Sequence, residues 1–198
     1  MKQLIKFSVR NTAWLLLLYC LGWAVWACMN WESLSMVQRL LMGMFGLLSA
    51  HEIEETYKDR FIVMMSKVIG FRPEELPMQG IIHLPADTVI ALLMSLAILH
   101  SDKMWLVLPV FVLGIIEMVV HNTAIVAFRL KGLSPGWYSA MVMGVYSIYS
   151  LVLICQSVAL DKFQWLWAAL LLAAGFGLLE VWIFAVCGKF KVTKWQTE

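Results

Sequence analysis

Six long apolar runs occupy most of this 198-residue chain and limit the folds that it can adopt. A helix needs about 20 residues to cross roughly 30 Å of hydrocarbon, and each run is close to that length. Inside a bilayer no water is present to form hydrogen bonds with backbone N–H and C=O groups. The runs therefore predict helices, which form these bonds internally, rather than open strands. We therefore expect an all-α, polytopic membrane helix bundle of about six transmembrane helices, in a single domain covering residues 1–198. The predicted spans are about 13–29, 35–55, 81–99, 104–128, 137–160 and 163–187.

Composition supports a membrane protein and argues against nucleic-acid binding. Hydrophobic residues make up 62% of the chain and charged residues 14%, whereas a soluble domain usually has about a quarter charged residues. The formal net charge of +2 is small, and no basic cluster is interleaved with aromatic residues. Four cysteines lie in apolar runs without metal-type spacing, which indicates that they pack as small hydrophobic side chains. They are Cys20, Cys28, Cys155 and Cys187.

The distribution of basic residues predicts the orientation in the membrane. If the N-terminus is cytoplasmic, only Arg39, Lys103 and Lys162 of the 15 lysines and arginines fall on the opposite side. Under the positive-inside rule, this bias places both termini in the cytoplasm. Residues 56–80 then form a cytoplasmic loop. Its apolar stretch is too short to span, and we expect it to lie in the interface or to cover the bundle end.

Eight ionisable side chains lie inside or at the ends of the apolar runs. Charged groups within a bilayer are costly unless they are paired or bound to a metal, so they indicate a functional site. With a rise of about 1.5 Å per residue, counting from the helix ends places them at similar depth in the inner-leaflet half of the bundle. They are His51, Glu54, Glu55, His83, Asp87, Glu117, His121 and Glu180.

The spacing of these residues is typical of a metal site. Residues four apart share one helix face, and helix bundles build metal centres from inward-facing Glu and His pairs. Such pairs are His51 with Glu55, Glu117 with His121, and His83 with Asp87. A divalent metal, zinc or iron, would suit mixed imidazole and carboxylate ligands. We predict His51, Glu55, Glu117 and His121 as metal ligands, Glu54 and Glu180 as catalytic residues, and His83 and Asp87 as possible additional site residues.

Structural explanations compete with each of these assignments. The carboxylates of residues 51–55 could emerge into the cytoplasm and pair with nearby basic residues. Glu117 and His121 could form a buried ion pair without a metal, and Asp87 could cap its helix. Glu52 points away from the face of the other motif residues, so we expect it to be solvated or to face lipid headgroups.

The string His51-Glu52-Ile53-Glu54-Glu55, together with a later histidine and a turn motif, resembles the HXXEE family of bacterial membrane proteins. His121 followed by Leu133-Ser134-Pro135-Gly136 is similar to the second block of that family, with leucine where the family has tyrosine. The resemblance covers roughly residues 40–160. It implies a bacterial cytoplasmic (inner) membrane and a site at these residues, but no reaction. Physically, Ser134 is expected to cap the next helix and Pro135 to occupy its first turn.

Three functions fit this pattern. The first is an intramembrane metal-dependent enzyme that hydrolyses or oxidises a membrane lipid or another apolar small molecule, with metal-activated water as the reactant. The second is a metal-free acid–base isomerase of sterol-like or isoprenoid substrates. The third is a proton- or cation-coupled transporter. The sequence shows neither the inverted repeat nor the pair of Gly- or Pro-interrupted helices that usually indicate a transporter, which argues against this function. The number of ions, the oligomeric state and the choice between hydrolysis and oxidation stay open.

Overall fold

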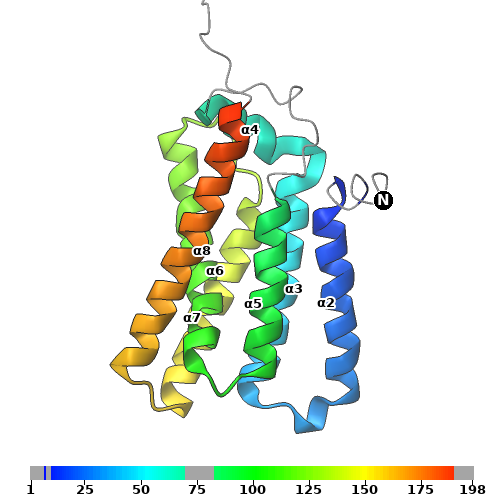
Figure 1. Ribbon diagram of the computed structural model, residues 1–198, viewed down its shortest axis with the longest axis vertical. Helices are drawn as coiled ribbons and strands as arrows, with labels where there is room; N and C mark the ends of the chain where they lie inside the picture. Colours follow the sequence, from blue (N-terminus) through cyan, green and yellow to red (C-terminus); the bar gives the residue numbers. More distant parts are fainter. Residues whose placement is uncertain (1–6, 8–9, 70–82, 190–198) are drawn as a thin grey trace, which may run out of the picture.

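A bundle of antiparallel helices forms the whole described part of the chain. The computed structural model describes residues 7, 10–69 and 83–189, and this part is helical without strands. Figure 1 shows the long helices side by side, alternating in direction, as the sequence predicts. The helices are α2 (Thr12–Met29), α3 (Met36–Thr56), α4 (Arg60–Ile69), α5 (Leu84–Leu99), α6 (Met104–Ala127), α7 (Trp137–Ser157) and α8 (Lys162–Lys189), with the 3₁₀ turns η1 (Trp31–Ser33) and η2 (Tyr57–Asp59).

The long helices have the character of an integral membrane protein. Four are long and apolar enough to cross a membrane: α2, α6, α7 and the stretch Lys162–Leu179 of α8. α5 is a shorter apolar helix. α3 is a continuous helix, but the ionisable residues of its last two turns make it less apolar than the other four. Both nevertheless run along the other four in the bundle (Figure 1). The bounds agree with the predicted spans within three residues, except that residues 81–82 lie outside the described residues.

A sharp turn separates α3 from α4. Lys58 and Asp59 have left-handed backbone angles, with φ of 54° and 55°, which an α-helix cannot contain. The chain then turns into α4, which lies across one end of the bundle (Figure 1), here called the α4 end. Phe61 of α4 packs against His83, with 5.0 Å between ring centroids. This helix falls in the segment predicted to be interfacial, of which residues 70–80 lie outside the described residues.

Helix α3 is packed on several sides, and this position brings its polar residues inside the bundle. It contacts α2, α5, α6 and α7. Along its middle turns, Leu41, Met44 and Phe45 are completely buried, in one core with Phe111 of α6 and Met143 of α7. Because α3 has neighbours on more than one face, ionisable residues in its last turns meet other helices rather than lipid.

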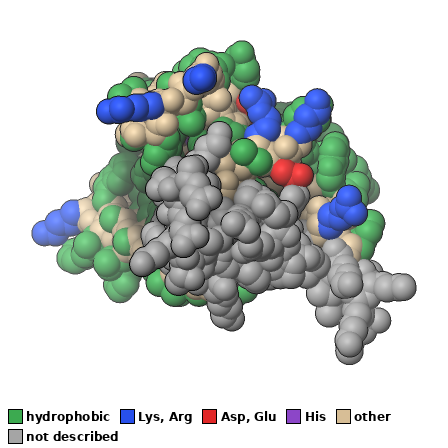
Figure 2. Space-filling view, turned by 90° about the horizontal axis from the view of Figure 1, so that it is seen from above, with side chains coloured by type: hydrophobic (Ala, Val, Ile, Leu, Met, Phe, Trp, Pro, Cys, Tyr) green, Lys and Arg blue, Asp and Glu red, His purple; other side chains and the backbone are tan. Residues whose placement is uncertain are grey.

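Basic side chains collect at the α4 end. Both ends of the described chain lie there (Figure 1), and Figure 2 shows Lys and Arg side chains around the rim of this end. Among the described residues, the exposed cations of the α4 end outnumber those of the opposite end, in agreement with the predicted bias. Those of the α4 end are Arg10, Lys58, Arg60, Arg129 and Lys131, and those of the opposite end are Arg39, Lys103 and Lys162.

Candidate metal centre

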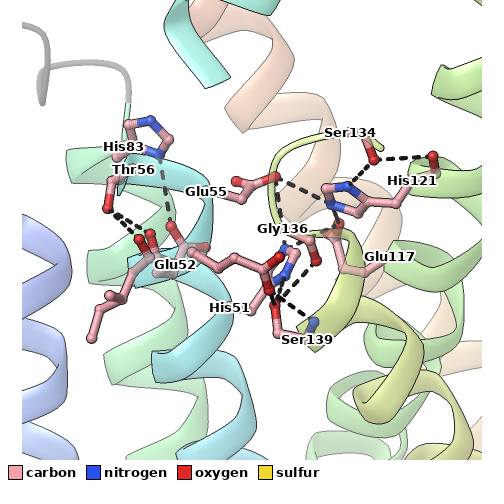
Figure 3. Close-up of polar contacts among 12 residues, drawn as sticks. His51, Glu52, Glu55, Thr56, His83, Glu117, His121, Ser134, Gly136 and Ser139 are labelled. Carbon is pink, nitrogen blue, oxygen red and sulfur yellow. Dashed lines mark hydrogen bonds and ion pairs between the residues drawn. The ribbon is translucent and has the colours of Figure 1, made fainter. Parts of the chain in front are cut away.

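Three buried side chains from two helices converge near the α4 end. His51 and Glu55 come from the last turns of α3, and His121 comes from α6. Their possible ligand atoms all lie within 4.8 Å of one another. Glu55 Oε1 is 3.2 Å from His121 Nε2 and 3.8 Å from His51 Nε2 (Figure 3). The predicted shared site of the two sequence blocks is therefore formed in space.

Glu117 completes the same cluster from the other side. Its Oε2 atom is 3.8 Å from His51 Nε2 and 3.6 Å from His121 Nε2. The side chain is 22% exposed, whereas those of His51 and His121 are at most 4% exposed. All four predicted metal ligands thus lie together, and Glu117 is the one that faces outward.

Two serines fix the orientation of the histidine rings. Ser134 Oγ donates to the carbonyl oxygen of His121 and lies 2.9 Å from Nδ1 of the same residue. Ser139 Oγ donates to the carboxylate of Glu54 or to the carbonyl of Gly136, and lies 3.1 Å from His51 Nδ1. Where a hydroxyl gives its only hydrogen to that other acceptor, it accepts from the ring, and Nδ1 of that ring then carries a proton.

With Nδ1 protonated, Nε2 faces the carboxylates of Glu55 and Glu117 either as a bare nitrogen or, in an imidazolium, as a second N–H donor. A lone pair directed at a carboxylate is repulsive unless a cation or a second ring proton lies between them. Hydrogen bonds of this type are 2.7–3.2 Å long, yet three of the four Nε2–carboxylate distances are 3.6–3.8 Å. The possible ligand atoms of His51, Glu55 and His121 are mutually close enough to share one ion, whereas Glu117 is not part of that group of three.

Glu54 lies beside this cluster and binds the start of α7. Its carboxylate accepts hydrogen bonds from the backbone N–H groups of Tyr138 and Ser139, at 3.3 and 2.8 Å, and from the hydroxyl of Ser139. A carboxylate at a helix N-terminus is stabilised by the unpaired N–H groups and by the helix dipole. The structure thus places the predicted general base in a capping role, linked to His51 through Ser139.

Gly136 permits the close approach of α7 to the cluster. It is the residue before the first turn of α7 and has φ of 80°, a left-handed conformation that favours glycine. A Cβ atom added there would lie 2.6 Å from Glu55 Cγ, 2.7 Å from His51 Cε1 and 3.1 Å from His121 Cε1. The glycine of the turn motif is therefore required both by backbone conformation and by space.

The roles predicted for Ser134 and Pro135 at the helix start are wrong. α7 begins at Trp137, so Pro135 precedes the helix, and the Ser134 hydroxyl binds His121 instead of a free N–H group of the helix. Glu54 from α3 supplies the cap. A cap from a distant segment cannot be recognised in the local sequence. A serine in a turn indicates only that its hydroxyl can bind backbone groups a few residues away.

A second buried group adjoins the first. Glu52, Glu55 and His83 also have possible ligand atoms within 4.8 Å of one another, and His83 Nδ1 is 3.7 Å from Glu52 Oε2 (Figure 3). Glu52 is 6% exposed, so the expectation that it is solvated or faces headgroups is wrong. α5 covers that side of α3, and its first residues place His83 and the buried Asp87 there.

The remaining predicted residue is Glu180. It belongs to α8, which packs against α6, but its side chain lies outside the described residues. Its predicted catalytic role stays a prediction. Among the described residues, sequence reasoning missed Ser139 and the burial of Glu52. Ser139 follows the turn motif by three residues, which is the only sequence signal that pointed to it.

Comparisons with protein-family models, with curated proteins and with solved structures gave no match. The resemblance to the HXXEE family therefore stays a prediction that depends on the motif residues.

Proposed function

We propose that this protein is an intramembrane metal-dependent enzyme that acts on a lipid or another apolar small molecule. The observation that supports this most strongly is the convergence of His51 Nε2, His121 Nε2 and Glu55 Oε1 in a buried position. A serine hydroxyl lies within hydrogen-bond distance of Nδ1 in both rings. Histidine ligands of metal sites usually have such a hydrogen bond at the ring nitrogen that does not bind the metal.

The metal in this proposal is zinc or iron. Two imidazoles and one carboxylate are a ligand set found in catalytic zinc sites, where three protein ligands leave one position for water. Two histidines with a carboxylate also suit non-haem iron. A divalent ion held there would make water a nucleophile near neutral pH. Its two positive charges would balance the carboxylates of Glu55 and Glu117.

Glu117 is our candidate for the general base, in place of Glu54, which caps α7. It lies within 3.8 Å of both Nε2 atoms and is the most exposed of the four residues. Val120, three residues further along α6, is 49% exposed, so this side of α6 is open to hydrocarbon. A substrate dissolved in the bilayer would reach Glu117 from that side.

Hydrolysis is the simplest reaction that these groups support. Water would add its oxygen to the acyl carbon of an ester, Glu117 would take a proton from that water, and the proton would pass to the leaving alcohol oxygen as the carbon–oxygen bond breaks. An iron ion at the same ligands would suit oxidation instead, for which molecular oxygen and a two-electron reductant would be needed as co-substrates.

One distance favours a metal-free alternative. His121 Nε2 and Glu55 Oε1 are 3.2 Å apart, within the range of a hydrogen bond. A proton held between these two atoms would give the acid–base pair that an isomerase needs. We place the isomerase second because one shared proton would leave the carboxylate of Glu117 without the charge balance that a divalent ion would supply.

Metal analysis of the detergent-purified protein tests the proposal. We expect at least one equivalent of zinc or iron in the wild type and its loss in His51→Ala and in His121→Ala. The control is His100→Ala, because His100 is exposed at the opposite end of the bundle. A wild type that holds no metal, even after reloading, would refute the metal-dependent enzyme and favour the isomerase.

Substrate and base are tested with a membrane lipid extract followed by mass spectrometry. The loaded enzyme should convert a lipid into a product that has gained water or an oxygen atom, and the metal-stripped enzyme should not. Glu117→Gln should keep its metal and lose activity by roughly 100-fold or more, the usual contribution of general base catalysis. Loss of the metal in this variant would instead make Glu117 a ligand, as the sequence predicts.

A further inference from the structure

Glu55 belongs to two groups of possible ligands at once. It is shared by the cluster of His51 and His121 and by the cluster of Glu52 and His83. All five residues are buried. In Figure 3 Glu52 and His83 lie on one side of Glu55, with the two other histidines on the opposite side. A carboxylate in this position has two oxygens with which it can contact two different ions.

The second group contains buried polar atoms without hydrogen bonds. Among the described residues, Glu52 Oε2 and His83 Nε2 have no hydrogen-bond partner, and neither oxygen of Asp87 has one. Glu52, His83 and Asp87 are each at least nine-tenths buried. Unpaired polar groups in such surroundings cost free energy, and charged ones cost more, so buried acids and imidazoles of this kind are usually paired or bind metal.

Charge points in the same direction. Asp87 and Glu52 are neighbouring acids, so their carboxylates need a shared proton or a cation between them. Between described residues, the ion pairs of Glu52, Glu55 and Glu117 are all with histidines. No lysine or arginine takes part in these pairs. One divalent ion at the first cluster balances Glu55 and Glu117. Glu52 and Asp87 lie outside the first cluster, and a second divalent ion would balance their carboxylates where both are ionised.

We propose that Glu52, His83 and Glu55 bind a second divalent metal ion, with Asp87 as an additional oxygen ligand and Glu55 bridging the two ions. The inference rests on the proposed function, because the first ion is the one proposed there. Ions in two-metal sites lie about 3.5–4 Å apart, a separation that one carboxylate can bridge. This second site offers one imidazole and several carboxylates, a set that suits manganese, iron and zinc.

Stoichiometry in the protein stripped of metal and reloaded with Zn²⁺ is the first test. We expect two equivalents in the wild type, one in His83→Ala, one in Glu52→Gln and two in the control His100→Ala. Glu52→Gln nearly preserves the shape of the side chain, so it reports on the site even if His83→Ala fails to fold. A wild type with two equivalents that both variants retain would overturn the second site.

The result for the first site separates the two proposals. One equivalent in the wild type, lost in His121→Ala and kept in His83→Ala and Glu52→Gln, would leave the proposed function standing and overturn the second ion. No bound Zn²⁺ at all would refute both. The wild-type value is measured without any substitution and decides between these cases.

Electron paramagnetic resonance of the Mn²⁺-loaded protein tests the bridge. Two Mn²⁺ ions that share Glu55 should interact, so that the wild type shows a coupled spectrum and Glu52→Gln the spectrum of an isolated ion. Two bound equivalents with only isolated-ion spectra would refute the bridging position of Glu55.

Discussion

Ser139 is a small residue with three partners, and its position explains how a ligand is oriented in a site that is otherwise made of charged groups. Its hydroxyl lies 3.1 Å from His51 Nδ1 and donates to Glu54 or to the carbonyl of Gly136. It thereby turns the Nε2 atom of His51 toward Glu55 and Glu117. An alanine would leave the Nδ1–H group buried without this partner.

We expect Ser139→Ala to weaken metal binding by roughly 10–100-fold, the usual effect of removing such a supporting group. A titration against a competing chelator measures this. Ser150→Ala, at a buried serine of the same helix, is the control and should bind metal as the wild type does. Equal affinities in the two variants would show that the serine does not support a ligand.

Gly136 gives a second test with a control in the same loop. Gly136→Ala combines a left-handed backbone, which costs about 1–2 kcal/mol for other residues, with a Cβ atom 2.6 Å from Glu55. We expect a lower apparent unfolding temperature and a loss of bound metal. Gly132 has nothing within 4 Å of its added Cβ atom, so Gly132→Ala should change neither quantity. Full metal binding by Gly136→Ala would contradict the packing described here.

At the scale of an element, the last two turns of α3 form a polar arc that successive helices cover. With about 100° per residue, Glu54 lies about 60° to one side of His51, Glu55 about 40° to the other side and Glu52 about 100° away. Along this arc the partners change from α7 to α6 and then to α5. Glu55 lies between His51 and Glu52 on the helix, and for this reason it contacts both clusters.

Glu54, at one end of this arc, joins α3 to α7, and its role can be separated from catalysis. Removing a capping carboxylate costs about 0.5–2 kcal/mol, so we expect Glu54→Ala to lower the apparent unfolding temperature. Glu54→Gln keeps an acceptor oxygen, and it should retain most of the activity on whatever lipid substrate is found. A Glu54→Gln variant that is stable but inactive would restore Glu54 as the general base.

These elements also show what sequence can and cannot predict. Apolar runs gave the helices to within a few residues, because the length needed to cross a bilayer is a property of each segment alone. The grouping of His51, Glu55, Glu117 and His121 followed from depth and spacing. The burial of Glu52 could not be predicted in this way, since nothing in the sequence of α3 indicates that α5 covers the side of the helix on which Glu52 lies. The Glu54 cap on α7 joins residues 84 or 85 positions apart, beyond the reach of a local pattern.

For the whole molecule, the position of the site at the α4 end leads to a prediction about orientation. The exposed cations of the described chain are concentrated there, so we expect that end, and the candidate site with it, to face the cytoplasm. Lys131→Cys and Lys103→Cys would report on the two ends in a background without native cysteines. A membrane-impermeant maleimide should label Lys103→Cys in intact spheroplasts and Lys131→Cys only after permeabilisation. The reverse pattern would invert the orientation.

The order of the helices along the chain has a consequence for biosynthesis. α3 is made early, but the described partners of its acidic end in other helices come later: His83 at the start of α5, His121 in α6 and Ser139 in α7. While the ribosome is still producing these helices, three glutamates would face lipid with only His51 of the same helix beside Glu55, if α3 were fully inserted. The end of α3 must therefore wait at the aqueous surface, or beside the insertion machinery, and move to its final depth only when α7 has emerged.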